Sequence, residues 1–219
     1  MFARWLARLR LKDPTYAFLF EPGPEGEAVS LDCETTGLDR RKDEIVSIAA
    51  VRIRGSRVLT SEAFQATVRC ARAIKPEAIK VHGLRERDVA MGRAMAEVLP
   101  PLLRFIGGRP LVGYYLEFDV AILNRYLRAW LGIGLPNPRV EVSGLYYDRK
   151  YGDAPPGTHV DLSFAEIASD LKLELIDQHD ALADATTAAL MYVMLKDMQT
   201  RRARIARTPY SPTAGFTGG

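Results

Sequence analysis

Two acidic side chains in the segment DCETTG have a spacing that suits metal binding. Asp32 and Glu34 stand two residues apart at the end of AVSLDCE, an alternating segment typical of a β-strand. Residues two apart on a strand leave the same face of the sheet, so their carboxylates lie close together. Crowding two carboxylates costs free energy unless a cation lies between them. An acid-x-acid pair also arises by chance in most chains of this composition, so the pair alone leaves both interpretations open.

A histidine and two further acids stand together in QHDALADATTAAL, near the C-terminal end. His179 is one of only three histidines, and Asp180 and Asp184 lead into an Ala/Thr/Leu run that predicts a helix. There is an ordinary explanation, in which Asp180 caps the helix and Asp184 is a first-turn acid favoured by the helix dipole. Asp119, at the start of another predicted helix, has the same alternative. Taken singly, each acid is compatible with a structural role.

The segments around these residues predict the elements that position them. Strands are predicted at 28–34, at 44–59 with a hairpin turn at Gly55-Ser56, at 63–69 and at 109–114. Helices are predicted at 75–84, 95–107, 118–132, 162–173 and 181–204. Pro100 and Pro101 are expected to kink or restart the second of these helices, and 136–158 is expected to be rich in loops. This order indicates an α/β fold, a mixed sheet with helices on both faces.

Composition predicts one globular domain in a reducing compartment. The chain has 219 residues, of which 47% are hydrophobic and 26% charged, and these are globular values. Its two cysteines, Cys33 and Cys70, form no paired motif, which fits the cytoplasm. The purely apolar runs fall far short of the roughly 20 residues of a membrane span, so no transmembrane segment is predicted.

Basic residues are concentrated at the two ends of the chain. The first segment contains Arg4, Arg8, Arg10 and Lys12 without an acid, and Arg201, Arg202, Arg204 and Arg207 follow Gln199. Basic ends around an acidic middle are usually solvated tails, but they also suit a protein that holds a polyanion. The opening residues place Phe2, Trp5, Leu6 and Leu9 on one helical stripe, which predicts a short amphipathic helix docked on the domain. Contact with a membrane surface or a partner is the alternative.

Four segments in one order resemble the DnaQ-like, or DEDDh, 3′–5′ exonucleases, the family of the polymerase III proofreading subunit. DCETTGL (32–38) is similar to the family's D-x-E-T-T-G-L, and VHGL (81–84) to its helix-Gly-apolar step. VGYYLEFDVAILN (112–124) is similar to VGHNxxFDxxxLN, and HDALADA (179–185) to H-x-A-L-x-D-A. The resemblance divides the chain into an N-terminal basic helix and linker (1–26), an exonuclease domain (27–200) and a basic, disordered tail (201–219).

The resemblance implies an RNase H-like fold, a five-stranded mixed sheet flanked by helices, and a site for two Mg²⁺ or Mn²⁺ ions. Asp32 would bridge both ions, Glu34 and Asp184 would complete the site on the nucleophile side, and Asp119 would serve the second. Oxygen ligands select such hard cations. His179 would be the general base, and its ordinary pKa near 6.5 suits that role at neutral pH.

The same resemblance implies how substrate is held. The side chains and backbone of Thr35, Thr36, Gly37 and Leu38 would lie beside the terminal nucleotide. Leu84 would pack on a base or sugar, with a plain core role as the alternative. Tyr114 and Tyr115 replace the family's His-Asn, and either stack on a base or pack in the core. The family's Asp-Thr-Leu is also absent, and VEVSGLYYDRK stands in its place.

The function implied is metal-dependent removal of nucleoside monophosphates from 3′ ends of single-stranded DNA, in replication, proofreading or repair. A DNA polymerase is a candidate partner, although no clamp-binding pentapeptide is evident, so a stand-alone nuclease fits equally well. Two alternatives stay open. One is an RNA-trimming exoribonuclease of the same family, because no residue in the sequence identifies a 2′-hydroxyl sensor. The other is a polymerase-associated binding module that keeps the fold.

Overall fold

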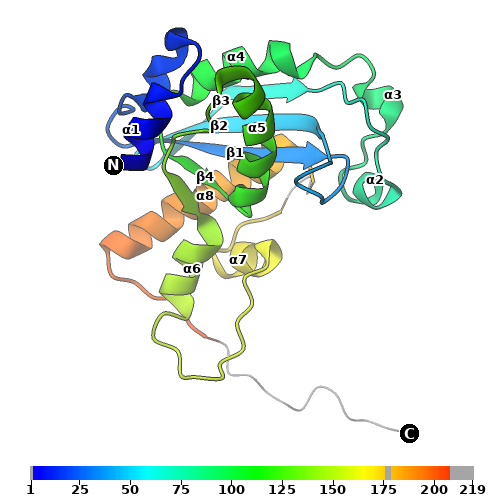
Figure 1. Ribbon diagram of the computed structural model, residues 1–219. Coiled ribbons are helices and arrows are strands. Elements are labelled where there is room, and N and C mark those ends of the chain that lie inside the picture. Colours follow the sequence, from blue (N-terminus) through cyan, green and yellow to red (C-terminus); the bar gives the residue numbers. More distant parts are fainter. Residues whose placement is uncertain (1, 176–178, 208–219) are drawn as a thin grey trace, which may run out of the picture.

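A five-stranded mixed sheet is the centre of the fold (Figure 1). The computed structural model describes residues 2–175 and 179–207. The strands are β1 (Glu27–Thr35), β2 (Ile45–Arg54), β3 (Arg57–Thr67), β4 (Leu111–Gly113) and β5 (Arg139–Glu141), in the order β3-β2-β1-β4-β5. The first three strands pair antiparallel, and β4 and β5 run parallel to β1. The predicted mixed sheet is confirmed.

Helices cover both faces of this sheet. They are α1 (Phe2–Leu9), the 3-10 helix η1 (Pro14–Phe20), α2 (Pro76–His82), α3 (Glu86–Val89), α4 (Met95–Ile106), α5 (Leu116–Leu131), α6 (Val142–Lys150), α7 (Phe164–Asp170) and α8 (Ala181–Thr200). Helices α4 and α5 lie over one face, and α8 crosses the other with α6 and α7 beside it (Figure 1). No helix in the described part of the chain is long and apolar enough to span a membrane.

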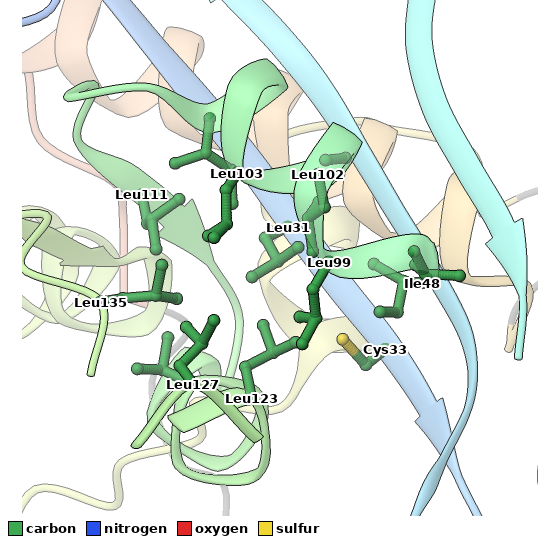
Figure 2. Packing of buried hydrophobic residues seen from close by; sticks show 14 of the residues in the cluster. Leu31, Cys33, Ile48, Leu99, Leu102, Leu103, Leu111, Leu123, Leu127 and Leu135 are labelled. Carbon is green, nitrogen blue, oxygen red and sulfur yellow. The ribbon is translucent and has the colours of Figure 1, made fainter. Parts of the chain in front are cut away.

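The alternation of β1 assigns its side chains to the two faces. Val29, Leu31 and Cys33 belong to the apolar cluster formed with α4 and α5, and Figure 2 shows Leu31 and Cys33 facing leucines from those helices. The alternate positions of β1 therefore face α8. Asp32 and Glu34 are among them, so the sequence pattern that builds the core also sends both carboxylates to the opposite face.

Helix α4 continues through its two prolines as one element, so the predicted restart is wrong. A proline cannot donate a backbone hydrogen bond, and Pro101 leaves the carbonyl of Glu97 without its helical donor. The guanidinium of Arg93 donates to that carbonyl at 2.7 Å. An apolar face that includes Leu99, Leu102 and Leu103 is buried in the core. This packing and the replacement donor keep the segment helical.

The segment VSGLYYDRK forms α6, although the sequence predicted a region rich in loops. Glu141 caps this helix, and its carboxylate accepts a hydrogen bond from the Ser143 hydroxyl at 3.1 Å. Lys150, at the last turn, is buried and pairs with Glu166 and Asp170 of α7 at 2.8 and 2.7 Å. These ion pairs come from a separate segment, so local sequence signals could not indicate them.

The N-terminal helix is confirmed, and Leu6 of its predicted apolar stripe is half-buried. Trp5 and Leu9 are exposed, whereas Ala7 packs against the main core cluster. The Arg4 guanidinium also donates to the Phe20 carbonyl at 3.0 Å. The linker that follows contains η1, which buries Tyr16, Leu19 and Phe20.

The basic C-terminal segment is ordered as far as Arg207, so the prediction of a disordered tail is wrong for residues 201–207. The Ile205 N–H donates to the Arg149 carbonyl at 3.1 Å, and its side chain packs against the cluster beneath α6 and α8. Arg204 and Arg207 form ion pairs with Asp153. The rest of the predicted tail, 208–219, lies outside the described residues.

Candidate active site

Small side chains let α8 approach the sheet closely. Ala49 and Val51 of β2 form a buried cluster with Ala181 and Ala185 from the first turns of α8. With only methyl and isopropyl groups between them, the helix and the strands can pack at short range. Asp184 lies in the same helical turns, next to Ala185, and is therefore carried toward the face of β1 that presents acids.

Three of the predicted ligands meet at this point. One carboxylate oxygen from each of Asp32, Glu34 and Asp184 lies within 4.8 Å of the other two. Asp180 does not belong to this group, because its Oδ1 accepts hydrogen bonds from the N–H groups of Leu182 and Ala183, both at 3.0 Å. Its predicted role as the cap of α8 is confirmed.

Asp119 lies beside the three-carboxylate group. It sits in the first turn of α5, and only 4% of its surface is exposed. Its charge is the largest contribution, after burial, to the raised pKa of Asp32. The charge of Glu34 in turn raises the pKa of Asp119. All four predicted acids therefore share one electrostatic environment, although they come from three segments far apart in the sequence.

Burial and mutual repulsion make this group unfavourable without a counter-ion. Burial, followed by the neighbouring carboxylates, raises the pKa of Asp32 well above its ordinary value and that of Glu34 to about 7. Burial also raises the pKa of Asp119 and of Asp184. A cation bound between the carboxylates would relieve both costs. An oxygen-only donor set fits a hard divalent ion, and several carboxylates are enough to hold one.

His179 lies directly before Asp180, the cap of α8, in a left-handed backbone conformation with φ of 68°. Its N–H donates to Oδ2 of Asp184 at 3.0 Å, and its side chain is exposed. A hydrogen bond from the backbone of one predicted site residue to the carboxylate of another ties the histidine to the acidic group. The residue with the uncommon backbone conformation is thus the one whose N–H donates to Asp184.

A second histidine near the site had no role assigned from the sequence. His82 ends α2, and its Nδ1 accepts a hydrogen bond from the Leu84 N–H at 3.1 Å. Nδ1 is therefore unprotonated, so Nε2 carries the proton and donates to the Thr35 carbonyl at 3.1 Å. Burial lowers the pKa of His82, and the charge of His179 contributes to this. The motif VHGL includes His82, but only the fold shows that its ring contacts the Leu84 N–H and the Thr35 carbonyl.

The loop after β1 is held by its own hydroxyl groups. The Thr35 hydroxyl donates to the Gly37 carbonyl at 2.7 Å, and the Thr36 hydroxyl donates to Asp43 at 3.2 Å. Asp43 also pairs with Lys75 at 2.7 Å. A Cβ atom at Gly37 would lie 2.6 Å from the Asp43 carboxylate, so glycine is needed for this closure. The two threonines thus shape the loop, and Leu38 at its tip is 87% exposed.

The remaining predicted contact residues differ in their surroundings. Leu84 is partly buried against a small apolar cluster, which is the core role left open as the alternative. Tyr114 also packs internally, with its ring 5.0 Å from that of Phe164 and its hydroxyl donating to the Leu162 carbonyl at 3.1 Å. Tyr115 is 74% exposed, so the core interpretation holds for Tyr114 and is wrong for Tyr115.

Leu38 lines two cavities. A cavity of about 330 Å³ extends from Glu34 to α2, where Ala78, Val81 and His82 line it. A larger cleft of about 1180 Å³ is lined by Tyr115 and by the loop that follows Leu38. Glu34 of the acidic group lines the smaller cavity, and the larger cleft shares Leu38 and Lys75 with it.

Comparison with known proteins identifies the family of this chain. Residues 29–192 match the RNase_T family model, whose description is exonuclease. The chain belongs to this exonuclease family. The acidic group thus lies in an exonuclease domain of the DnaQ type, as the sequence motifs predicted.

Curated relatives of this exonuclease domain carry the name DNA polymerase III. DNA polymerase III subunit epsilon of Aquifex aeolicus is 31% identical over 171 residues, which cover 78% of this chain and 81% of that protein. DNA polymerase III PolC-type of Thermotoga maritima is 28% identical over 196 residues, which cover 86% of this chain. This chain spans only 13% of the length of the PolC-type relative.

Solved structures of other exonucleases share the fold. Exonuclease I of E. coli in complex with a dA16 oligonucleotide superposes with a TM-score of 0.67 at 19% identity, and the match covers 81% of this chain and 42% of that one. Exonuclease X in complex with 5′ overhanging duplex DNA gives 0.61 at 22% identity, and covers 81% and 95%. The predicted RNase H-like exonuclease fold is confirmed.

Proposed function

We propose that this exonuclease is a 3′–5′ enzyme that releases nucleoside monophosphates from single-stranded DNA. The observation that carries the proposal is the convergence of Asp32, Glu34 and Asp184 within 4.8 Å of one another, beside the buried Asp119. The names of the relatives, which are DNA polymerase III proteins, support DNA as the substrate. They also support a DNA polymerase as a partner.

The four carboxylates would hold two divalent ions, Mg²⁺ or Mn²⁺. In this assignment Asp32, Glu34 and Asp184 would hold one ion, and Asp32 and Asp119 would hold the other. When bound, such a pair stabilises the attacking and the leaving oxygen of an in-line displacement at phosphorus. The protein contributes a rigid ligand set, because Asp32 and Glu34 are fixed by the ladder of β1 and Asp184 by the packing of α8.

His179 would accept the proton of the attacking water. Its backbone N–H contacts Asp184 and its side chain is exposed, so solvent can reach the imidazole. His82 is the only other histidine that borders Glu34 and Thr35 in the described residues, and both of its ring nitrogens are occupied. A base must have a free nitrogen within reach of the proton that it takes. These observations favour His179 over His82.

Strand polarity and product size test this proposal. A 5′-labelled single-stranded oligonucleotide should give progressively shorter labelled fragments with Mg²⁺ or Mn²⁺, and a 3′-labelled one should release labelled mononucleotide first. Asp32→Ala and Asp184→Ala should abolish release, as should EDTA. His179→Ala should lower kcat by about 10²–10⁴, the usual contribution of a general base.

Asp148→Asn is a matched control, because Asp148 is exposed on α6, outside the acidic group. This control should keep the wild-type rate. Matched RNA oligonucleotides decide between DNA exonuclease and RNA-trimming activity. Release of nucleotides from the 5′ end, or metal-dependent activity that survives Asp32→Ala, would refute the proposal.

A further inference from the structure

The larger cleft beside Leu38 has walls from four separate segments. Its volume is about 1180 Å³, which is larger than the roughly 300–1,000 Å³ of sites for small ligands. The loop after β1 forms one wall, with Arg40 and Arg41. The other wall consists of Tyr115 and Phe118 at the start of α5 together with residues at the start of α6, and Lys75 lines the cleft as well. Basic groups and aromatic rings therefore border the same space.

Tyr115 presents its ring to this cleft from a rigid backbone. The residue has a left-handed conformation, with φ of 57°, directly before α5. Its N–H donates to Oε1 of Glu141 at 3.0 Å, and the N–H of Leu116 donates to Oε2 of the same carboxylate at 3.0 Å. The Tyr115 and Phe118 rings lie 6.5 Å apart with an interplanar angle of 34°. A fixed, exposed aromatic face of this kind suits stacking with a nucleobase.

The acidic side chains that line the cleft already have hydrogen-bond or ion-pair partners within the protein. Glu141 accepts the two N–H groups at the start of α5, and Glu117 pairs with Arg139 at 2.7 Å. Asp39 accepts the Arg41 N–H at 2.9 Å. Each of the three acids that line the cleft thus already has a donor.

The two arginines of the opposite wall, Arg40 and Arg41, form no ion pair within the described part of the chain. Both side chains are exposed. The Arg40 carbonyl, by contrast, is held by Arg125 at 3.0 Å, which fixes the loop. Two guanidinium groups on a fixed loop, without acidic partners, suit recognition of phosphate.

We propose that this cleft binds the unpaired nucleotides that precede the terminal one, with a base stacked on Tyr115 and phosphates held by Arg40 and Arg41. The inference rests on the proposed function, which places the terminal nucleotide at the acidic group. A stacked base must leave its duplex partner, so the cleft selects single-stranded 3′ ends. Duplex ends would have to fray before entry.

The test compares variants of the full chain on two substrates. One is a single-stranded oligothymidylate, and the other is the p-nitrophenyl ester of thymidine 5′-monophosphate, which carries no upstream nucleotide. Tyr115→Ala should raise KM and Kd for the oligonucleotide about tenfold, whereas Tyr115→Phe keeps the aromatic face and should stay within about twofold. The loss of kcat/KM for the oligonucleotide should exceed the loss for the ester by about tenfold.

The salt dependence of binding tests the role of the two arginines. Arg40→Gln combined with Arg41→Gln should reduce the slope of log Kd against log salt concentration by about 1.4, as expected for two lost phosphate contacts to a single strand. The matched control is Arg57→Gln with Arg104→Gln, which removes the same charge from two exposed positions, on the β2–β3 hairpin and on α4. This control should keep the wild-type slope.

Binding measured in EDTA separates this inference from the proposed function. If the wild type degrades oligonucleotides but Tyr115→Ala and the double arginine variant bind like the controls, the cleft assignment is wrong and the nuclease assignment stands. If the wild type releases no nucleotide, the proposed function fails, and the binding data still decide whether the cleft takes up a strand. Equal losses on the oligonucleotide and the ester would show a structural role and overturn the inference.

Discussion

At the scale of single residues, the carboxylates of the site make the protein less stable when they are charged. The pKa of Glu34 is raised to about 7, first by burial and then by the charges of Asp184 and Asp180. A carboxyl group with a raised pKa binds its proton more tightly in the folded state than in the unfolded state. Folding stability is then highest at low pH and falls as the pH rises through the folded pKa.

We therefore expect the free energy of unfolding in EDTA to fall by about 2–3 kcal/mol between roughly pH 4.5 and 7 through Glu34 alone. Glu34→Gln should remove the part of the pH dependence that Glu34 contributes, because the amide does not titrate, while the part that comes from Asp32, Asp119 and Asp184 should remain. Urea unfolding at several pH values measures the effect. Added Mg²⁺ should restore stability to the wild type above neutral pH. A wild-type stability that rises with pH across this range would contradict the electrostatic description of the site.

At the scale of elements, Glu141 connects three parts of the fold. It ends β5, caps α6 and accepts the first N–H groups of α5, the helix that carries Asp119. Its charge also contributes to the raised pKa of Asp119, after burial and Glu34. The acid thus stabilises the start of a helix whose first turn contributes to the active site.

Glu141→Ala should lower the free energy of unfolding by about 1–2 kcal/mol, since the N–H groups of Tyr115 and Leu116 lose their acceptor. Glu141→Gln keeps one oxygen acceptor and should cost less than half as much. Chemical denaturation of the two variants makes the comparison. Equal losses for Ala and Gln would show that the charge, and not the hydrogen bonds, matters at this position.

At the scale of the whole molecule, the chain after α8 packs against the segment that follows α6. Arg204 and Arg207 pair with Asp153, in the segment after α6, and Ile205 joins the cluster between α6 and α8. These contacts connect the segment after the last helix to a region some fifty residues earlier in the chain. Arg204 and Arg207 of this segment are used internally, so they are a weaker candidate for binding a polyanion than their charge suggested.

A chain that ends at Thr200 should therefore unfold at a free energy about 1–2 kcal/mol lower than the full chain, because it loses partly buried apolar surface and the ion pairs of Asp153. A chain that ends at Arg207 keeps all of these contacts and is the matched control. Thermal and urea unfolding of both proteins test the prediction. If the two truncated chains are equally stable, the contacts of residues 201–207 do not contribute.

The sequence by itself determined the family motifs, most of the strands and helices, and the acids that share the site. It could do so because strand alternation, helix periodicity and the cap at Asp180 are local patterns. Only the tertiary structure decided how Asp119 joins the other carboxylates, that both ring nitrogens of His82 are hydrogen-bonded, and that Tyr115 faces a cleft and not the core. It also decided that VSGLYYDRK is helical and that α4 tolerates its prolines. Each of these outcomes depends on a donor, an ion pair or a packed surface from a distant segment, and local spacing carries no information about such contacts.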